Sequence, residues 1–244
     1  MGDVMLALAR TFDSLKTGRV WLYLLTPALL ALLVTVGLAF WALGWMVQQM
    51  MDYTPMTLLV GWGLVSIAHA LAYLGGWMAI FAIAYLVAMI LAALVIMPLM
   101  LNHLAENQYR DVAAMGKDSF VAAAVNSVLA SIFFIVAWVV TIPLWLIPGF
   151  SLAIPLLLMA WLNRRTFAYD ALSMHATAGE WTTLRKERKA PLFMLGLTMA
   201  LLAHIPLLGL LVPALAALSF VHYGLEALRR SRCEAIVTIS GERL

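Results

Sequence analysis

The sequence predicts an all-α integral membrane protein with long transmembrane helices and shorter helical hairpins. Apolar residues make up 65% of its 244 residues and charged residues 11%, whereas soluble domains average about 25% charged residues. No aspartate, glutamate, lysine or arginine occurs in residues 20–51, 53–105, 119–163 and 190–225. Each stretch exceeds the roughly 20 apolar residues that a helix needs to cross a bilayer. This pattern excludes a soluble globular protein and a disordered chain.

Residues 1–19 are predicted to contain an amphipathic helix that lies in the membrane interface. Met5, Leu8, Phe12 and Leu15 recur at helical spacing, and the charged residues of this segment fall elsewhere on the helix. The helix would anchor the chain in the interface or act as a transport gate. Because charges occur throughout the segment and it has no apolar centre, we do not expect a cleavable signal peptide.

The distribution of lysine and arginine predicts which loops face the cytoplasm. The loop around Asp52 has none, whereas residues 1–19, 106–118, 164–189 and 226–244 each carry between two and six. By the positive-inside rule, only the Asp52 loop lies outside. Both termini then face the cytoplasm, and residues 226–244 form a cytoplasmic tail. The bias is modest, so an inverted orientation stays open.

This orientation determines how often each apolar segment crosses the membrane. Residues 20–47 cross once as a transmembrane helix. Residues 57–101 must cross an odd number of times, so we expect one long or bent transmembrane helix there. Residues 119–163 and 190–225 must each enter the membrane and return to the same side.

The last two segments are predicted to be helical hairpins interrupted by proline and glycine. Each arm of the second hairpin has about 14 residues, or about 21 Å, which is short of the roughly 30 Å hydrocarbon core. We therefore expect the second hairpin to be re-entrant, whereas the longer first hairpin could cross fully. Corresponding interrupted segments indicate a transport site, although proline and glycine are also common in membrane helices. The predicted breaks are Pro143, Pro148 and Gly149 in the first hairpin and Pro206, Gly209 and Pro213 in the second.

The candidate anion site is Gly18-Arg19, directly before the first long apolar helix. A helix N-terminus presents unpaired N–H groups and a partial positive charge. Glycine permits a close backbone approach, and arginine can donate two hydrogen bonds to an oxyanion such as sulfate. The same residues would also suit a basic flank that contacts lipid headgroups.

Asn102, Glu106 and Arg110 follow the second long apolar segment and form a candidate polar network on an ion path. Glu106 and Arg110 are four residues apart, so we expect them to pair on one helical face. Such a pair would avoid an isolated charge near the membrane. An ordinary salt bridge at a helix end would give the same pattern.

Other classes of function find no support in the sequence. The one cysteine, Cys233, permits neither an intramolecular disulfide nor a cysteine-based metal site. No histidine pair has the spacing of metal ligands, so we expect no metal and no cofactor. Motifs for hydrolases, zinc proteases and nucleotide binding do not occur, so we do not expect an enzyme. The net charge of +3 is spread over short loops, unlike the concentrated basic face of a nucleic-acid-binding protein.

Taken in order, several segments resemble the CysZ sulfate-permease family and the wider etoposide-induced membrane-protein superfamily. In that family the anion lies at a Gly-Leu-Arg turn before the first membrane helix, which corresponds to Gly18 and Arg19 here. The family's acidic residue in Leu-Ala-Glu corresponds to Glu106. The matching pieces are an amphipathic helix, Gly18-Arg19, Pro27, Pro98 with Leu104-Ala105-Glu106, Ile147-Pro148-Gly149, a basic loop with Asp170 and residues 184–189, and residues 205–208 with Gly209 and Pro213.

The resemblance implies one membrane domain, residues 1–244, that carries sulfate or a related oxyanion across the bacterial inner membrane for cysteine synthesis. It also implies a homo-oligomer in the lipid bilayer. The sequence has no ATP-binding loop, so we expect passive or ion-coupled movement. The alternative is a non-transporting membrane scaffold or biogenesis protein of the same superfamily, with a basic loop at residues 185–189 that binds anionic lipid.

Overall fold

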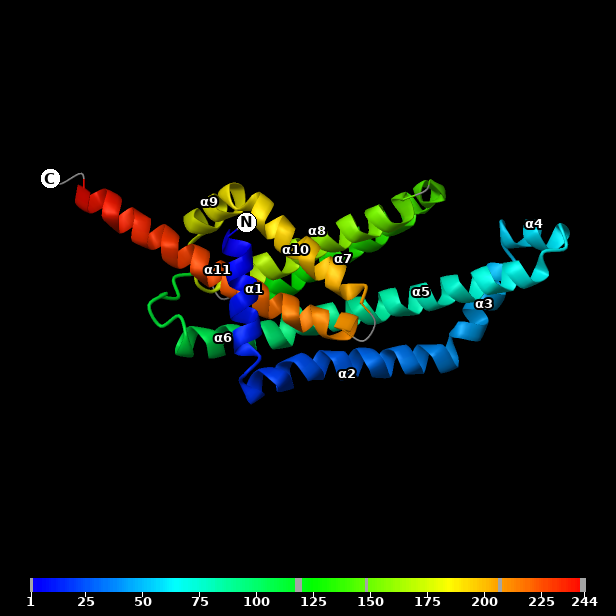
Figure 1. Ribbon diagram of the computed structural model, residues 1–244, viewed down its shortest axis with the longest axis horizontal. Coiled ribbons are helices and arrows are strands. Elements are labelled where there is room, and N and C mark those ends of the chain that lie inside the picture. The colour runs from blue at the N-terminus through cyan, green and yellow to red at the C-terminus, as the bar shows by residue number, and fades with distance from the viewer. Residues whose placement is uncertain (1, 117–119, 148, 206–207, 242–244) are drawn as a thin grey trace.

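The computed structural model confirms the all-α prediction. It describes residues 2–116, 120–147, 149–205 and 208–241, and these contain helices and no strand. The long helices lie side by side along the long axis of the molecule (Figure 1). The α-helices are α1 (Gly2–Ser14), α2 (Gly18–Trp41), α3 (Leu43–Met51), α4 (Met56–Gly61), α5 (Val65–Leu91), α6 (Met97–Asn107), α7 (Phe120–Thr141), α8 (Phe150–Ser173), α9 (Ala178–Glu187), α10 (Lys189–Ala203) and α11 (Leu208–Gly241).

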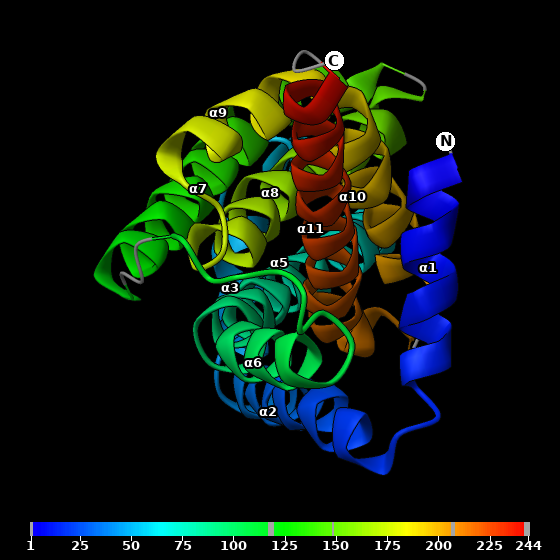
Figure 2. The ribbon, with the colours of Figure 1, turned by 90° about the vertical axis from the view of Figure 1, so that its left-hand side faces the viewer.

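The helix α1 runs across the direction of the long helices and packs against α11 (Figures 1 and 2). Its buried face consists of small residues at helical spacing, among them Ala7, Thr11 and Ser14. Met5 and Phe12 point away from the protein, with 67% and 63% of their surface exposed. The helix therefore has one face for the bundle and one apolar face that is free for lipid, and its place in the interface stays a prediction.

The first two long helices form an antiparallel pair (Figure 1). Helix α2 has 24 residues and is about 36 Å long, which suffices to cross a bilayer. Residues Val65–Asn107 form one continuous helix of 43 residues, made of α5, a π-helical turn at Ala92–Ile96, and α6. This agrees with the single long helix expected at residues 57–101, although residues 56–61 belong to the separate short helix α4.

A 3₁₀-helical turn, Ile142–Leu146, joins α7 to α8. Pro143 lies in the first turn of this segment. Gly149 has a φ of +86°, a left-handed conformation that favours glycine, and directly precedes α8. Pro148 lies outside the described residues. Helix α8 continues to Ser173 and so extends ten residues beyond the apolar segment 119–163.

The second hairpin differs from the prediction in where its helices begin and end. Helix α10 has 15 residues and is about 22 Å long. Gly209 and Pro213, which were predicted to be helix breaks, lie inside α11. Pro213 is the sixth residue of α11, so it removes one intrahelical hydrogen bond. Membrane helices tolerate such a proline because neighbouring helices and local adjustments satisfy the freed carbonyl group. Pro206 lies outside the described residues.

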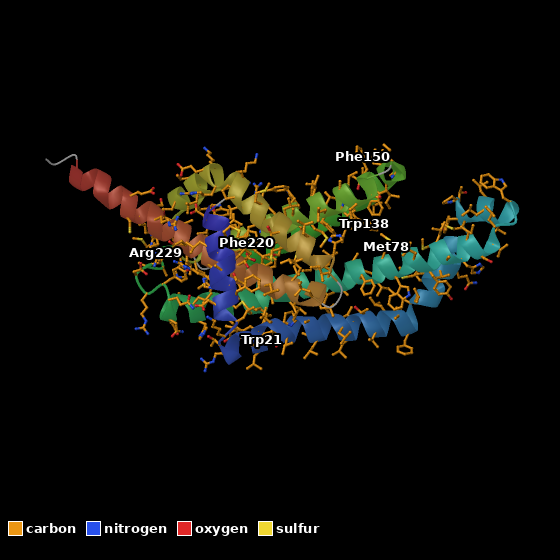
Figure 3. The ribbon with its side chains drawn as sticks, in the orientation of Figure 1. Trp21, Met78, Trp138, Phe150, Phe220 and Arg229 are labelled. Atoms are coloured by element: carbon orange, nitrogen blue, oxygen red, sulfur yellow. The ribbon has the colours of Figure 1, made fainter. Side chains whose placement is uncertain are left out.

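Helix α11 continues to Gly241, so residues 226–241 extend a helix instead of forming a separate tail. Its middle part is the centre of the bundle, where Phe220, among others, is fully buried (Figure 3). By contrast, α2 and α7 expose most of their apolar surface. Within the described part of the chain, four helices are long and apolar enough to cross a membrane. The protein is therefore a multi-pass membrane protein in a lipid bilayer.

Candidate functional site

The predicted anion site forms the open first turn of α2. Thr17 precedes the helix in an extended conformation, and its side chain makes no capping hydrogen bond. The Val20 N–H donates to the Thr17 carbonyl oxygen at 3.0 Å. The side chain of Thr17 leaves the N–H groups of Gly18 and Arg19 available to another acceptor. Gly18 and Arg19 are both exposed, and a Cβ atom on Gly18 would meet nothing within 4 Å. The geometry allows an oxyanion to reach the backbone at this turn.

Of the two basic residues at this turn, Lys16 and Arg19, only Lys16 forms an ion pair among the described residues, so the Arg19 guanidinium is free to bind an anion. Lys16 donates a hydrogen bond to the Asp13 carboxylate at 2.6 Å, which raises the pKa of Lys16 and lowers that of Asp13. No carboxylate in the described part of the chain pairs with Arg19. The Trp21 indole donates to the Leu15 carbonyl oxygen at 2.9 Å and so links this turn to the end of α1 (Figure 3).

The second predicted group, Asn102, Glu106 and Arg110, is exposed at the end of α6. The expected ion pair between Glu106 and Arg110 does not form. Instead, Arg110 Nε donates to the backbone carbonyl of Glu106. The reason is that α6 ends at Asn107, so Arg110 does not lie on the helical face that the four-residue spacing assumed. Arg110 therefore satisfies a carbonyl group at the helix C-terminus.

The two predicted groups lie at the same end of the molecule. Tyr23, one turn after Arg19, has its ring centroid 6.5 Å from that of His103, which follows Asn102. The start of α2 and the end of α6 are thus neighbours (Figure 2). The structure records no contact that joins Arg19 directly to Glu106 or Arg110.

A buried polar cluster lies between α1 and α11, and it was not predicted from the sequence. Arg10 donates to Glu226 at 2.6 Å and to the Tyr109 hydroxyl at 2.8 Å. The Ser14 hydroxyl lies 2.9 Å from His222 Nε2, and the Tyr109 hydroxyl lies 3.1 Å from His222 Nδ1. Burial alone would lower the pKa of Arg10, but its bonds to Glu226 and Tyr109 raise it overall. The cluster holds α1 firmly on the bundle.

A second set of ion pairs continues this cluster to the start of α10. Asp3 accepts hydrogen bonds from Arg188 at 2.9 Å and from Arg230 at 2.5 Å. Arg230 also donates to Glu226 at 2.9 Å. The histidine and glutamate at positions 222 and 226 lie four residues apart on α11, and this spacing was the only sequence signal for the cluster. Movement of α1 as a gate would require breaking these bonds.

Asp170 is the most unusual titratable residue at this end of the molecule. It lies at the inner end of α8, seven residues beyond the apolar segment 119–163, and 5% of its surface is exposed. Neither carboxylate oxygen has a hydrogen-bond partner among the described residues. Burial raises the pKa of Asp170 to about 8. The residue therefore holds a proton at neutral pH and can release it slightly above.

Asp170 and the predicted residue Asn102 line the same cavity. Its volume is about 200 Å³, and Ala93 of the π-helical turn and Pro98 also contribute to its wall. Turns of π-helix occur often at functional sites. The structure thus brings one predicted residue together with one buried carboxyl group that the sequence placed only in a basic loop.

A larger cavity of about 460 Å³ lies beside the turn between α10 and α11. It is lined by α5, α7, α8 and this turn, and its polar contributions include Tyr85 and His204. The Tyr85 hydroxyl donates to Asn163 at 3.1 Å. Because most of the lining is apolar, a dianion would be strongly destabilised in this cavity.

These features define a class: an α-helical, multi-pass membrane protein whose charged groups gather at one end, with an open basic turn. The chain belongs to the family described as sulfate transporter CysZ/etoposide-induced protein 2.4, whose model matches residues 7–213. This confirms the resemblance seen in the sequence. The matched region contains Gly18, Arg19 and Asn102, whereas Glu226 lies beyond it. Searches of curated proteins and of solved structures found no match.

Proposed function

We propose that the protein is a permease or channel for sulfate or a related oxyanion, and that Gly18 and Arg19 form its capture site. The observation that supports this best is the first turn of α2, with uncapped N–H groups beside an unpaired guanidinium. A tetrahedral oxyanion accepts hydrogen bonds from both kinds of donor and is favoured by the positive end of the helix dipole.

From the capture site, the anion would pass along the end of α6, where Asn102, Glu106 and Arg110 are exposed. The 3₁₀-helical turn Ile142–Leu146 after α7 and the turn at residues 204–205 after α10 would supply irregular backbone at membrane depth. If transport is coupled to protons, Asp170 is the candidate carrier, because it is buried beside Asn102 and can exchange a proton near neutral pH.

The family description names a sulfate transporter, and from the resemblance we infer a location in the bacterial inner membrane and a role in supplying sulfur for cysteine synthesis. We place both termini in the cytoplasm, on the basis of the basic residues at the end where α1, α6 and α9 gather. We also infer a homo-oligomer from the resemblance to this family.

Equilibrium binding of radioactive sulfate to the purified protein tests the capture site. Arg19→Ala should weaken binding about tenfold, since a hydrogen bond to a charged group contributes about 1.5 kcal/mol or more. Lys16→Ala is the matched control, because it removes the same charge from a neighbouring exposed residue whose partner is Asp13. Equal affinity for the wild type and Arg19→Ala would eliminate this site.

A non-transporting scaffold remains the second candidate, and one observation favours it. The polar cluster fastens α1 to α11 and leaves a cavity of only about 10 Å³ between them, as expected for a rigid structural element. The absence of specific sulfate binding and of sulfate uptake by the wild type would favour this candidate.

A further inference from the structure

A pocket separate from the α2 turn collects three arginines. It lies between α7, α8, α9 and α10 and has a volume of about 320 Å³. Arg164 and Arg165 come from α8, and Arg185 comes from α9. Two tryptophans, Trp161 and Trp181, also line it. The pocket therefore combines strong positive charge with large aromatic surfaces.

The positive charge of this pocket is not neutralised by the protein. Within the described ranges, no carboxylate forms an ion pair with any of the three arginines. Burial lowers the pKa of Arg164, and the nearby positive charges of Arg185 and Arg165 lower it further. Glu180, the acid in the first turn of α9, is held by Arg232 at 2.7 Å. An anion would relieve the repulsion.

One wall of the pocket is apolar and continues onto the outer face of α7. Leu129 and Phe133 line it and remain 60% and 55% exposed. The Phe133 ring packs against Trp161 with a centroid distance of 4.7 Å. Along the same helix, the exposed residues include Val125, Ile132 and Val136. A ligand in the pocket can thus contact arginines at one end and an apolar helix face at the other.

We propose that this pocket binds the phosphate group of an anionic phospholipid, whose acyl chain lies along α7. Arginine forms paired hydrogen bonds with phosphate, and basic pockets between membrane helices recognise anionic headgroups. Tryptophan is typical of the membrane–water interface, where a headgroup would sit. A free oxyanion would use the same donors but would leave the apolar wall and the α7 face without a partner. The site is independent of the capture turn at Gly18 and Arg19.

Native mass spectrometry of the detergent-purified protein tests this proposal with phosphatidylglycerol and phosphatidylcholine of identical acyl chains. The wild type should retain phosphatidylglycerol at least about fivefold better. The double variant Arg165→Gln, Arg185→Gln should lose this preference, and both positions are exposed, so the fold should persist. The double variant Lys186→Gln, Lys189→Gln removes the same charge from exposed residues outside the pocket and should keep the preference.

Three results would overturn the proposal. The first is equal retention of the two lipids by the wild type. The second is an equal loss of preference in both double variants, which would indicate general electrostatic attraction instead of a site. The third is displacement of phosphatidylglycerol by low concentrations of inorganic sulfate or phosphate, which would assign the arginines to a free oxyanion.

Discussion

Replacement of Asp170 by asparagine should change how the stability of the protein depends on pH. The side chain is buried at the end of α8, and neither of its oxygens has a partner among the described residues. Desolvation raises its pKa from 3.8 to about 8. The carboxyl group is therefore protonated in the folded protein at neutral pH and ionised in the unfolded chain. Asparagine has nearly the same shape and carries no charge at any pH.

The size of the effect follows from the pKa shift. The pKa is higher in the folded state, so the contribution is full below the unfolded pKa and is lost as pH rises through the folded pKa. One pKa unit corresponds to about 1.4 kcal/mol. Between about pH 6 and about pH 8, Asp170 is ionised in the unfolded chain and still largely protonated in the folded protein, so the free energy of unfolding should fall by about 2 kcal/mol.

Thermal unfolding in detergent, followed from about pH 6 to about pH 9, measures this loss. The wild-type Tm should fall over this range, and the Tm of Asp170→Asn should fall less. Glu187→Gln, an exposed substitution on the nearby helix α9, controls for the removal of one acidic residue and should follow the wild type. Parallel curves for the wild type and Asp170→Asn would refute the argument from burial.

Two further substitutions test the packing. Glu226→Ala removes the acceptor shared by three arginines and should lower the free energy of unfolding by about 3 kcal/mol. As a control, Asp13→Ala breaks a fully exposed ion pair and should leave Tm unchanged. Similar effects of the two substitutions would contradict a stabilising cluster. Gly196→Ala should cost about 1–3 kcal/mol, because the new Cβ would lie 2.5 Å from the Ala160 carbonyl oxygen on α8. Gly37→Ala on α2 meets open space and should raise stability by up to about 1 kcal/mol. A tolerated Gly196→Ala in the same Tm assay would show that α8 and α10 can separate.

The helical membrane fold was predictable because it depends on composition and on the lengths of the charge-free segments. Parity and segment length predicted one long or bent helix at residues 57–101, and the structure has the continuous helix Val65–Asn107 in this part of the chain. Helix ends were harder to predict. Membrane helices tolerate an interior proline, so Pro213 did not mark a break. Charged residues after position 225 ended the apolar segment without ending α11.

The candidate site was also predictable only in part from the sequence. Gly18 and Arg19 could be proposed from the sequence because an anion site of this kind needs only a helix start and a nearby arginine, and their role in anion capture stays a prediction. The prediction of an ion pair between Glu106 and Arg110 was wrong because the spacing rule assumes a continuous helix, and α6 ends at Asn107. The bond between Arg10 and Glu226 joins residues 216 positions apart, so only the packing of α1 on α11 could reveal it. Burial of Asp170 likewise depends on its neighbours from α6.

Sulfate uptake into proteoliposomes tests the central claim most directly. The comparison includes the wild type, Arg19→Ala, Lys16→Ala and empty vesicles. We expect saturable uptake by the wild type and by Lys16→Ala, with a severalfold loss in Arg19→Ala. Wild-type uptake at the level of empty vesicles would contradict a sulfate permease, although membership of the family would stand.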